Sequence, residues 1–162
     1  MRSFYEKNID IFLKAAIILL DIPVLSLGIM GLFLLVNYPA SPEFAPILYP
    51  IIIGLYLSAI PYFIALYQSF KLINYIDKDV SFSELSNHSL NKIKWCAMII
   101  SGLYVLILPF IADLAQMDDA PGLILMALVP IFASLVITVF AALLQRIFKE
   151  ARDIKSENDL TV

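Results

Sequence analysis

Asp21 is the residue whose type and position most strongly suggest chemistry. It lies well inside the apolar run Ile11–Val36, and a carboxylate near the centre of a bilayer costs at least about 2.5–3.5 kcal/mol on insertion scales. Such a group should face other helices rather than lipid, and it should be paired, hydrated or protonated. Lys14 lies two turns earlier on the same helical face, so Asp21 could take part in a proton or cation relay.

A structural interpretation of Asp21 competes with the relay. The carboxyl group could bond to a Tyr, a Ser or a backbone amide of a neighbouring helix, and Pro23 loosens backbone hydrogen bonding nearby. Tyr56, Tyr62 and Tyr104 lie deep enough in apolar runs to offer a hydroxyl. We favour this interpretation, because one acidic residue without a second intramembrane charge makes a poor transport pathway.

Four acidic residues form a second candidate site, the outer acidic cluster of Glu43, Asp113, Asp118 and Asp119. The loops that carry them contain no Lys or Arg, so the cluster could hold a divalent cation or attract a cationic peptide. Helix capping is the competing explanation. Asp118 or Asp119 ahead of Pro121 is typical of a helix N-terminus, where an acid meets free N–H groups and Pro fits the first turn. We favour capping.

The other reactive residue types are isolated. His88 and Cys96 are the only His and Cys in the sequence, and neither has partners at metal-ligand spacing. The sequence contains no nucleophile elbow, H-E-x-x-H motif, Walker loop or Gly-rich dinucleotide fingerprint. We therefore expect a protein that is not an enzyme, with no catalytic residues, no cofactor, no metal and no direct nucleic-acid binding.

The elements that must position these residues are membrane spans. Of the 162 residues, 61% are hydrophobic and 15% are charged, against about 45–50% and 25% in a soluble domain, and one small core cannot bury that excess. A run of about 20 apolar residues crosses a hydrocarbon core of about 30 Å. The runs that qualify are Ile11–Val36, Pro46–Leu72, Trp95–Ala112 and Gly122–Leu144.

The basic residues predict how the spans are oriented. All 11 Lys and Arg residues precede or begin the first span, lie between the second and third, or follow the fourth. Loops 37–45 and 113–121 contain none, so the positive-inside rule places both termini in the cytoplasm. Short loops make consecutive helices antiparallel neighbours. We therefore expect an all-α integral membrane fold, a single domain over residues 1–162 arranged as an up-down-up-down four-helix bundle.

Two segments on the inner side are predicted to have structure of their own. Ser81–Glu84 (SFSE) fits a capping box with Ser81 as N-cap. Apolar residues then recur at helical spacing up to Trp95, which predicts an amphipathic interfacial helix between spans two and three. After span four, residues 145–162 form a charged helical extension and tail.

Three segments carry a resemblance to a known family. They are Ile73–Asp77 (INYID), Phe82–Ser86 (FSELS) and Glu150–Val162 (EARDIKSENDLTV). Together with the four-span topology, they resemble the YoaS-like bacterial four-span membrane proteins, a family of unknown function. The resemblance implies a membrane location and genes paired with small helix-turn-helix regulators of the Cro type. It therefore implies a cytoplasmic regulator of helix-turn-helix type as partner, and it supplies no catalytic residues.

These observations leave three functional hypotheses. The leading one is a non-enzymatic bacterial inner-membrane protein, a regulatory or accessory partner that acts through its cytoplasmic loop (Asn74–Lys94) and tail (Gln145–Val162). Both segments carry dense mixed charge on the same predicted side. One alternative is a small transporter or channel element that uses Asp21. The other is an immunity or envelope-stress protein that engages cationic peptides at the outer acidic cluster.

Overall fold

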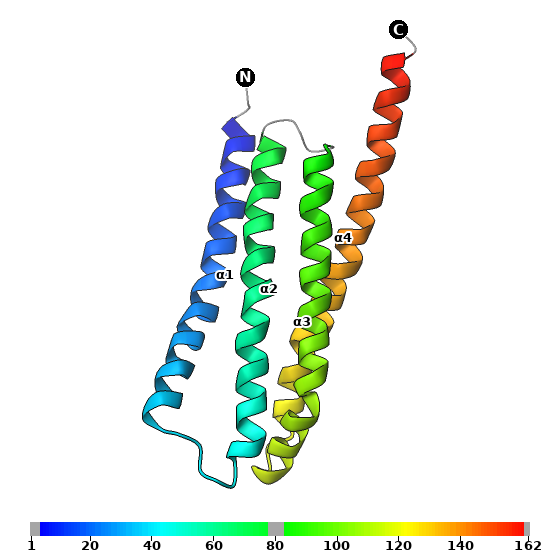
Figure 1. Cartoon of the computed structure of the whole chain (residues 1–162). Coiled ribbons are helices and arrows are strands. Elements are labelled where there is room, and N and C mark those ends of the chain that lie inside the picture. Colours follow the sequence, from blue (N-terminus) through cyan, green and yellow to red (C-terminus); the bar gives the residue numbers. More distant parts are fainter. Residues whose placement is uncertain (1–3, 78–82, 161–162) are drawn as a thin grey trace.

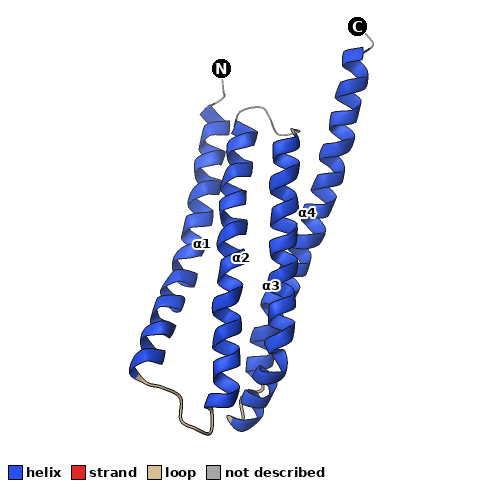
Figure 2. Ribbon diagram, in the orientation of Figure 1, coloured by secondary structure: helices blue, strands red, loops and turns tan. Residues whose placement is uncertain are grey.

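The fold consists of long helices. The computed structural model describes residues 4–77 and 83–160, and the side chains of residues 8–75 and 83–158. The helices are α1 (Phe4–Asn37), α2 (Ala45–Asp77), α3 (Glu84–Met117) and α4 (Gly122–Leu160) (Figure 1). The described residues contain no strand (Figure 2). Each helix is long and apolar enough to cross a membrane, which confirms the expected all-helical fold with four candidate spans.

The helices are longer than the apolar runs that predicted them. α4 has 39 residues, which at 1.5 Å per residue correspond to a rod of about 58 Å. A hydrocarbon core takes up only about 30 Å of that length. The C-terminal part of α4 projects past the other helices (Figure 1), so it forms an extension outside the hydrocarbon.

Consecutive helices run in opposite directions in Figure 1. The start of α1, the end of α2, the start of α3 and the end of α4 lie at one end of the molecule. We call this the basic end, because the described Lys and Arg residues lie on the helix halves nearest to it. The connections 38–44 and 118–121 lie at the opposite, acidic end. The first turns of α3 and the extension of α4 therefore share the basic end.

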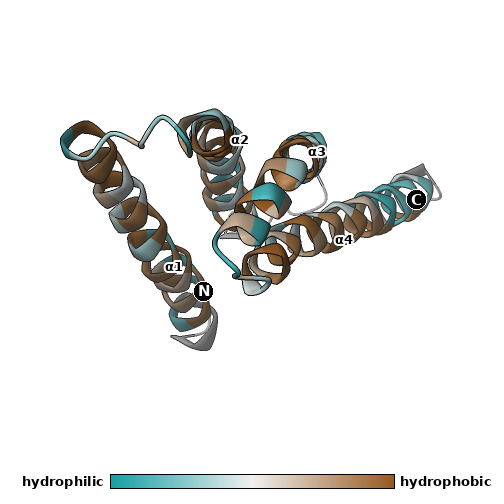
Figure 3. Cartoon of the chain, turned by 90° about the horizontal axis from the view of Figure 1, so that it is seen from below, coloured by the Kyte–Doolittle hydropathy of each residue, from teal (hydrophilic) through white to brown (hydrophobic). Residues whose placement is uncertain are grey.

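The helices form an open row rather than the closed bundle that we expected from the short loops. α3 packs along both α2 and α4, whereas α1 contacts α2 at only a few places. No described Cα atom of α1 lies within 8 Å of α3 or α4, and none of α2 lies that close to α4. Figure 3 shows the row from the acidic end. Lipid tails are as apolar as Leu side chains, so no hydrophobic force drives the outer faces together.

Small and apolar side chains fill the contacts of α3. Ile51 of α2, Ile107 and Ile111 of α3, and Ala127 of α4 form one buried cluster. Many of the other buried residues are Ala or Ser. Small side chains let helices approach closely enough for van der Waals packing, and that packing drives helix association in lipid.

The α3–α4 contact follows one stripe along α4. Its members recur at alternating steps of four and three residues and are buried or half-buried: Ala127, Ile131, Ser134, Thr138, Ala141, Gln145, Phe148 and Arg152. A repeat of 3.5 residues keeps one helix face against its neighbour over many turns. Because α3 is the neighbour of α4 within the described part of the chain, we assign this stripe to the α3 contact.

The predicted interfacial helix is not a separate element in the structure. Its residues from Glu84 onward form the first turns of α3, which runs without a break past Trp95 to Met117. No Gly or Pro lies between Glu84 and Ser101, so nothing in the backbone stops the helix at the start of the span.

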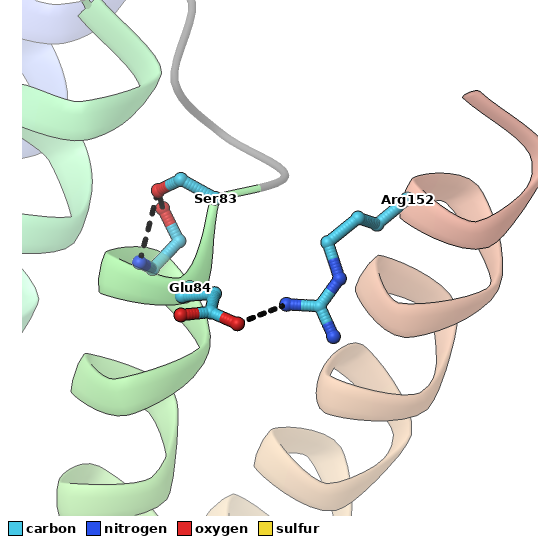
Figure 4. Close-up of polar contacts among 4 residues, drawn as sticks. Ser83, Glu84 and Arg152 are labelled. Atoms are coloured by element: carbon cyan, nitrogen blue, oxygen red, sulfur yellow. Dashed lines mark hydrogen bonds and ion pairs between the residues drawn. The ribbon is translucent and has the colours of Figure 1, made fainter. Parts of the chain in front are cut away.

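The N-terminus of α3 also differs from the predicted capping box. Ser83 is the N-cap, and its Oγ accepts a hydrogen bond of 3.3 Å from the Ser86 backbone N–H (Figure 4). Glu84 is therefore the first residue of the helix and not the third. The predicted cap, Ser81, lies outside the described residues. The two serines are alternative caps in the sequence, since each is followed by a polar residue three positions on.

Gly54 marks a close approach between α2 and α3. A Cβ atom at Gly54 would clash with Ile107 Cγ2 of α3, whereas a Cβ atom at Gly102 of α3 would meet nothing within 4 Å. We predict that Gly54→Ala destabilises the protein, because overpacking a tight contact costs about 1–3 kcal/mol. The unfolding midpoint in detergent micelles measures this effect.

Gly102→Ala is the matched control for this substitution. It should be neutral or slightly stabilising, because Ala has the higher helix propensity. Equal shifts of the unfolding midpoint for the two variants would contradict the close α2–α3 contact.

Candidate functional site

A polar cleft lies at the basic end, between the first turns of α3 and the extension of α4. Its volume is about 570 Å³. We call it the basic-end cleft, and its lining consists of Glu84, Leu85, Asn87, His88, Asn91, Gln145 and Arg152. The cleft thus offers a carboxylate, an imidazole, a guanidinium and several amides to a ligand.

Helix periodicity explains why these residues share one cleft. On α3, Glu84, His88 and Asn91 are four and three residues apart, so they lie on one face. On α4, Gln145 and Arg152 continue the stripe that packs against α3. Nearer the acidic end this stripe carries Ala, Ser and Ile, which allow close packing. At the cleft it carries the long polar side chains of Gln145 and Arg152 on either side of Phe148, so polar groups line the space between the two helices.

Gln145 joins the two helices at the cleft. Lys94 Nζ donates a hydrogen bond of 2.9 Å to Gln145 Oε1, and Gln145 Nε2 donates one of 3.4 Å to the Asn87 backbone oxygen. Asn87 Oδ1 is buried without a hydrogen-bond partner. A buried acceptor left unpaired costs about 1–3 kcal/mol. Asn87 therefore favours a ligand that brings an N–H or O–H group to the cleft.

The charged pair of the cleft is loosely held. Arg152 Nη1 lies 3.6 Å from Glu84 Oε1 (Figure 4), with 38% and 90% of the respective side chains exposed. An ion pair this long and exposed stabilises a fold by little. Both side chains can therefore exchange their mutual contact for a bound group at small cost.

The donors and acceptors of the cleft can bind polar groups of a ligand. Across the described residues, no three His, Cys, Asp or Glu side chains come close enough to hold a metal ion. His88 lies in the cleft one helical turn from Glu84, which also lines it.

From the sequence we predicted which segments take part in binding, but we did not predict that they form a cleft. The loop and the tail were predicted as a docking surface, whereas His88 and Gln145 were not singled out for any role in it. The signal lies in the α4 stripe, which keeps its 3.5-residue repeat from Ala127 to Arg152. Such a repeat indicates that α3 and α4 stay together beyond the apolar part of the span.

Asp21 lies on the face of α1 that packs against α2. Half-buried residues recur along this face, namely Lys14, Ile17, Asp21, Gly28, Gly31 and Leu35. The Tyr62 hydroxyl of α2 lies close enough to the Asp21 carboxyl group to interact with it electrostatically. Asp21 Oδ1 is buried and has no hydrogen-bond partner. The carboxyl group is thus only partly satisfied inside a membrane span.

The three candidate tyrosines have different surroundings. Tyr62 reaches Asp21, and the Tyr56 hydroxyl donates a hydrogen bond of 2.6 Å to the Gly28 backbone oxygen of α1. Tyr104 belongs to α3 and packs against the buried apolar cluster, on a helix that does not contact α1. The Tyr56 hydrogen bond therefore ties α1 to α2 directly, and Tyr62 adds an electrostatic interaction with Asp21.

The acids of the outer acidic cluster lie in two separate connections, 38–44 and 118–121, and at the end of α3. Its acids are not part of any three-residue metal-binding group within the described residues. Asp118 is the C-cap of α3, with its N–H bonded to Leu114 O at 3.0 Å, and Asp119 has a positive φ of 49° in the turn that follows. The sequence had suggested these two residues as caps at the start of span four. Their turn ends α3 instead, and Pro121 directly precedes α4.

We predict an energetic coupling between Asp21 and Tyr62. In a double-mutant cycle of Asp21→Asn and Tyr62→Phe, the coupling energy should be about 0.6 kcal/mol, the average for polar side-chain interactions between membrane helices, and at most about 1.7 kcal/mol. Unfolding equilibria in micelles measure it. The same cycle with Tyr104→Phe is the control, since Tyr104 does not reach α1. Equal coupling in both cycles would show that Tyr62 does not specifically hold Asp21.

Comparisons with known proteins place the chain in a family. The model of the family described as "Protein of unknown function (DUF2975)" matches residues 34–162. A relative from Bacillus subtilis (strain 168), described as "Uncharacterized membrane protein YoaS", is 53% identical over 154 residues, which cover 94% of this chain and 96% of the relative. No solved structure matches. The YoaS-like resemblance is thereby confirmed, and the chain belongs to the DUF2975 family of unknown function, as a relative of a membrane protein.

Proposed function

We propose that this protein is a non-enzymatic accessory protein of the bacterial inner membrane, which holds a cytoplasmic regulatory protein at the membrane surface. The basic-end cleft is the observation that carries the proposal. It combines residues from both charged segments in one polar cleft with a volume of about 570 Å³. Because the cleft lies beyond the apolar parts of α3 and α4, a protein in the aqueous phase can reach it.

The groups in the cleft favour a protein surface as ligand. Arg152 suits a carboxylate, because the guanidinium fork matches two carboxylate oxygens. Asn87 Oδ1 requires a donor, and Leu85 adds an exposed apolar contact. A partner helix with an acidic, an amide and an apolar residue on one face would satisfy all three. A small helix-turn-helix regulator, the class that the family resemblance implies, is the partner that we propose.

The proposal requires the basic end to face the cytoplasm, in keeping with the positive-inside rule. We predict that Ser156→Cys, in a Cys96→Ser background, reacts with a membrane-impermeant maleimide only after the cells are opened. Ser41→Cys at the acidic end should react in intact cells. Both serines are exposed. Labelling of Ser156→Cys in intact cells would rule out this orientation.

We predict that Arg152→Glu weakens partner binding about tenfold or more, because it replaces the cation of the cleft with a repelling carboxylate. Arg146→Glu is the matched control. It makes the same change of charge six residues earlier on α4, outside the cleft lining, where Arg146 pairs with Glu150 at 3.0 Å and 80% of its side chain is exposed. Its effect should stay within about twofold.

The measurement uses the purified regulator and the intact chain in nanodiscs. Candidate regulators are identified first by photo-crosslinking from position 91 in the cleft, with position 126 on the apolar part of α4 as the negative control. Equal loss of affinity for the Arg152→Glu and Arg146→Glu variants would indicate a general charge effect and would remove the cleft from the proposal.

A further inference from the structure

The extension of α4 carries a second stripe, which does not face α3. Leu144, Ile147, Ala151 and Ile154 are three, four and three residues apart. Each of the first three directly precedes a member of the α3-facing stripe, so the second stripe lies about 100° around the helix from it. Ile147 and Ile154 are 54% and 62% exposed. No described part of α1 or α2 contacts α4. Among the described helices only α3 lies beside this face, where Ala151 is half-buried and the other three side chains are exposed.

Lipid cannot cover most of this stripe. Leu144 ends the apolar run of α4, and Ile154 lies ten residues later, about 15 Å farther along the helix axis. The residues around Ile147 and Ile154 are largely charged. Within the hydrocarbon, lipid would be as good a neighbour as another helix. Outside it the alternative is water, so burial of this stripe against a protein surface is favourable.

The spacing of the stripe matches the inner positions of a coiled coil, and the charges beside it are complementary. Leu144 and Ala151 take inner position a of the heptad abcdefg, and Ile147 and Ile154 take inner position d. Glu150 and Lys155 then occupy two of the flanking positions, g and e, and Phe148 and Glu157 occupy the other two. In a parallel pair, Glu150 of one helix faces Lys155 of the other. The bilayer imposes the parallel arrangement, because every copy is inserted in the same orientation.

We propose that two copies of this chain associate through their α4 extensions, in a parallel two-stranded coiled coil over residues 144–158 with Leu144, Ile147, Ala151 and Ile154 at its centre. Glu150 forms an exposed pair with Arg146 of its own helix at 3.0 Å, and such a pair is weak enough to share Glu150 with Lys155 of the second copy. The basic-end cleft stays open, because it lies on the neighbouring face of α4. The proposal is therefore independent of the partner that the cleft binds.

Cysteine cross-linking in native membranes tests the geometry. In a Cys96→Ser background, Ala151→Cys and Ile154→Cys should form disulfide-linked dimers when an oxidant is added. Lys149→Cys and Ser156→Cys, on the opposite side of the extension, are the controls and should give about tenfold less dimer, because a disulfide requires Cβ atoms about 3.5–4.5 Å apart. Equal yields at all four positions, or adducts of Ile154→Cys with another protein in place of the dimer, would overturn the proposal.

A charge exchange tests the register. Glu150→Lys and Lys155→Glu should each lower the dimer yield of the Ile154→Cys chain by about threefold, because like charges then face each other. The combined exchange should restore the yield, since the opposite charges meet again. A combined variant that stays as low as the single variants would contradict the proposed register. Far-UV circular dichroism of the purified variants shows that α4 remains helical, so a loss of dimer is not mistaken for unfolding.

Discussion

Close packing of α3 against both α2 and α4 is the constraint on which the other features depend. In lipid, helices gain little from burying apolar surface, so they associate where small side chains allow tight contact. Gly54, Ser101 and Ser134 belong to this small-residue surface. α1 has no such continuous contact and depends on Tyr56 and on the interaction of Tyr62 with Asp21. Apolar packing thus unites α2, α3 and α4, while polar bonds attach α1.

The same constraint gives the basic end its shape. Since α3 and α4 are held together through the span, they leave it side by side and continue into the aqueous phase. There the 3.5-residue stripe of α4 changes from small residues to Gln145 and Arg152, and the contact becomes a hydrogen-bonded cleft. The face beside that stripe becomes the exposed row that ends at Ile154. A polar cleft and an exposed apolar row therefore follow from one long helix that is packed on one side only.

The sequence predicted the helices better than their arrangement. The lengths of the apolar runs predicted four spans, and the basic residues predicted that the inner loop and the tail lie on the same side. Both properties can be read from short stretches of the chain without knowledge of how the helices pack. The cap of α3 differed, since Ser83 and Ser81 have similar local chemistry and packing decides between them. Whether α1 closes a bundle depends on contacts between helices, which periodicity does not encode. For the same reason Asp21 was recognised as unusual from the sequence, whereas its electrostatic interaction with Tyr62 became visible only in the structure.

The region that defines the family coincides closely with the packed unit. The family model begins at residue 34, near the end of α1, and extends over α2, α3 and α4. These are the helices that share apolar contacts, the cleft and the α4 extension. The Bacillus subtilis relative is similar over nearly the whole chain, so much of α1 is present there too. A helix attached through a few polar bonds can vary in sequence without disturbing the packed unit, whereas changes in α3 would affect both of its neighbours at once.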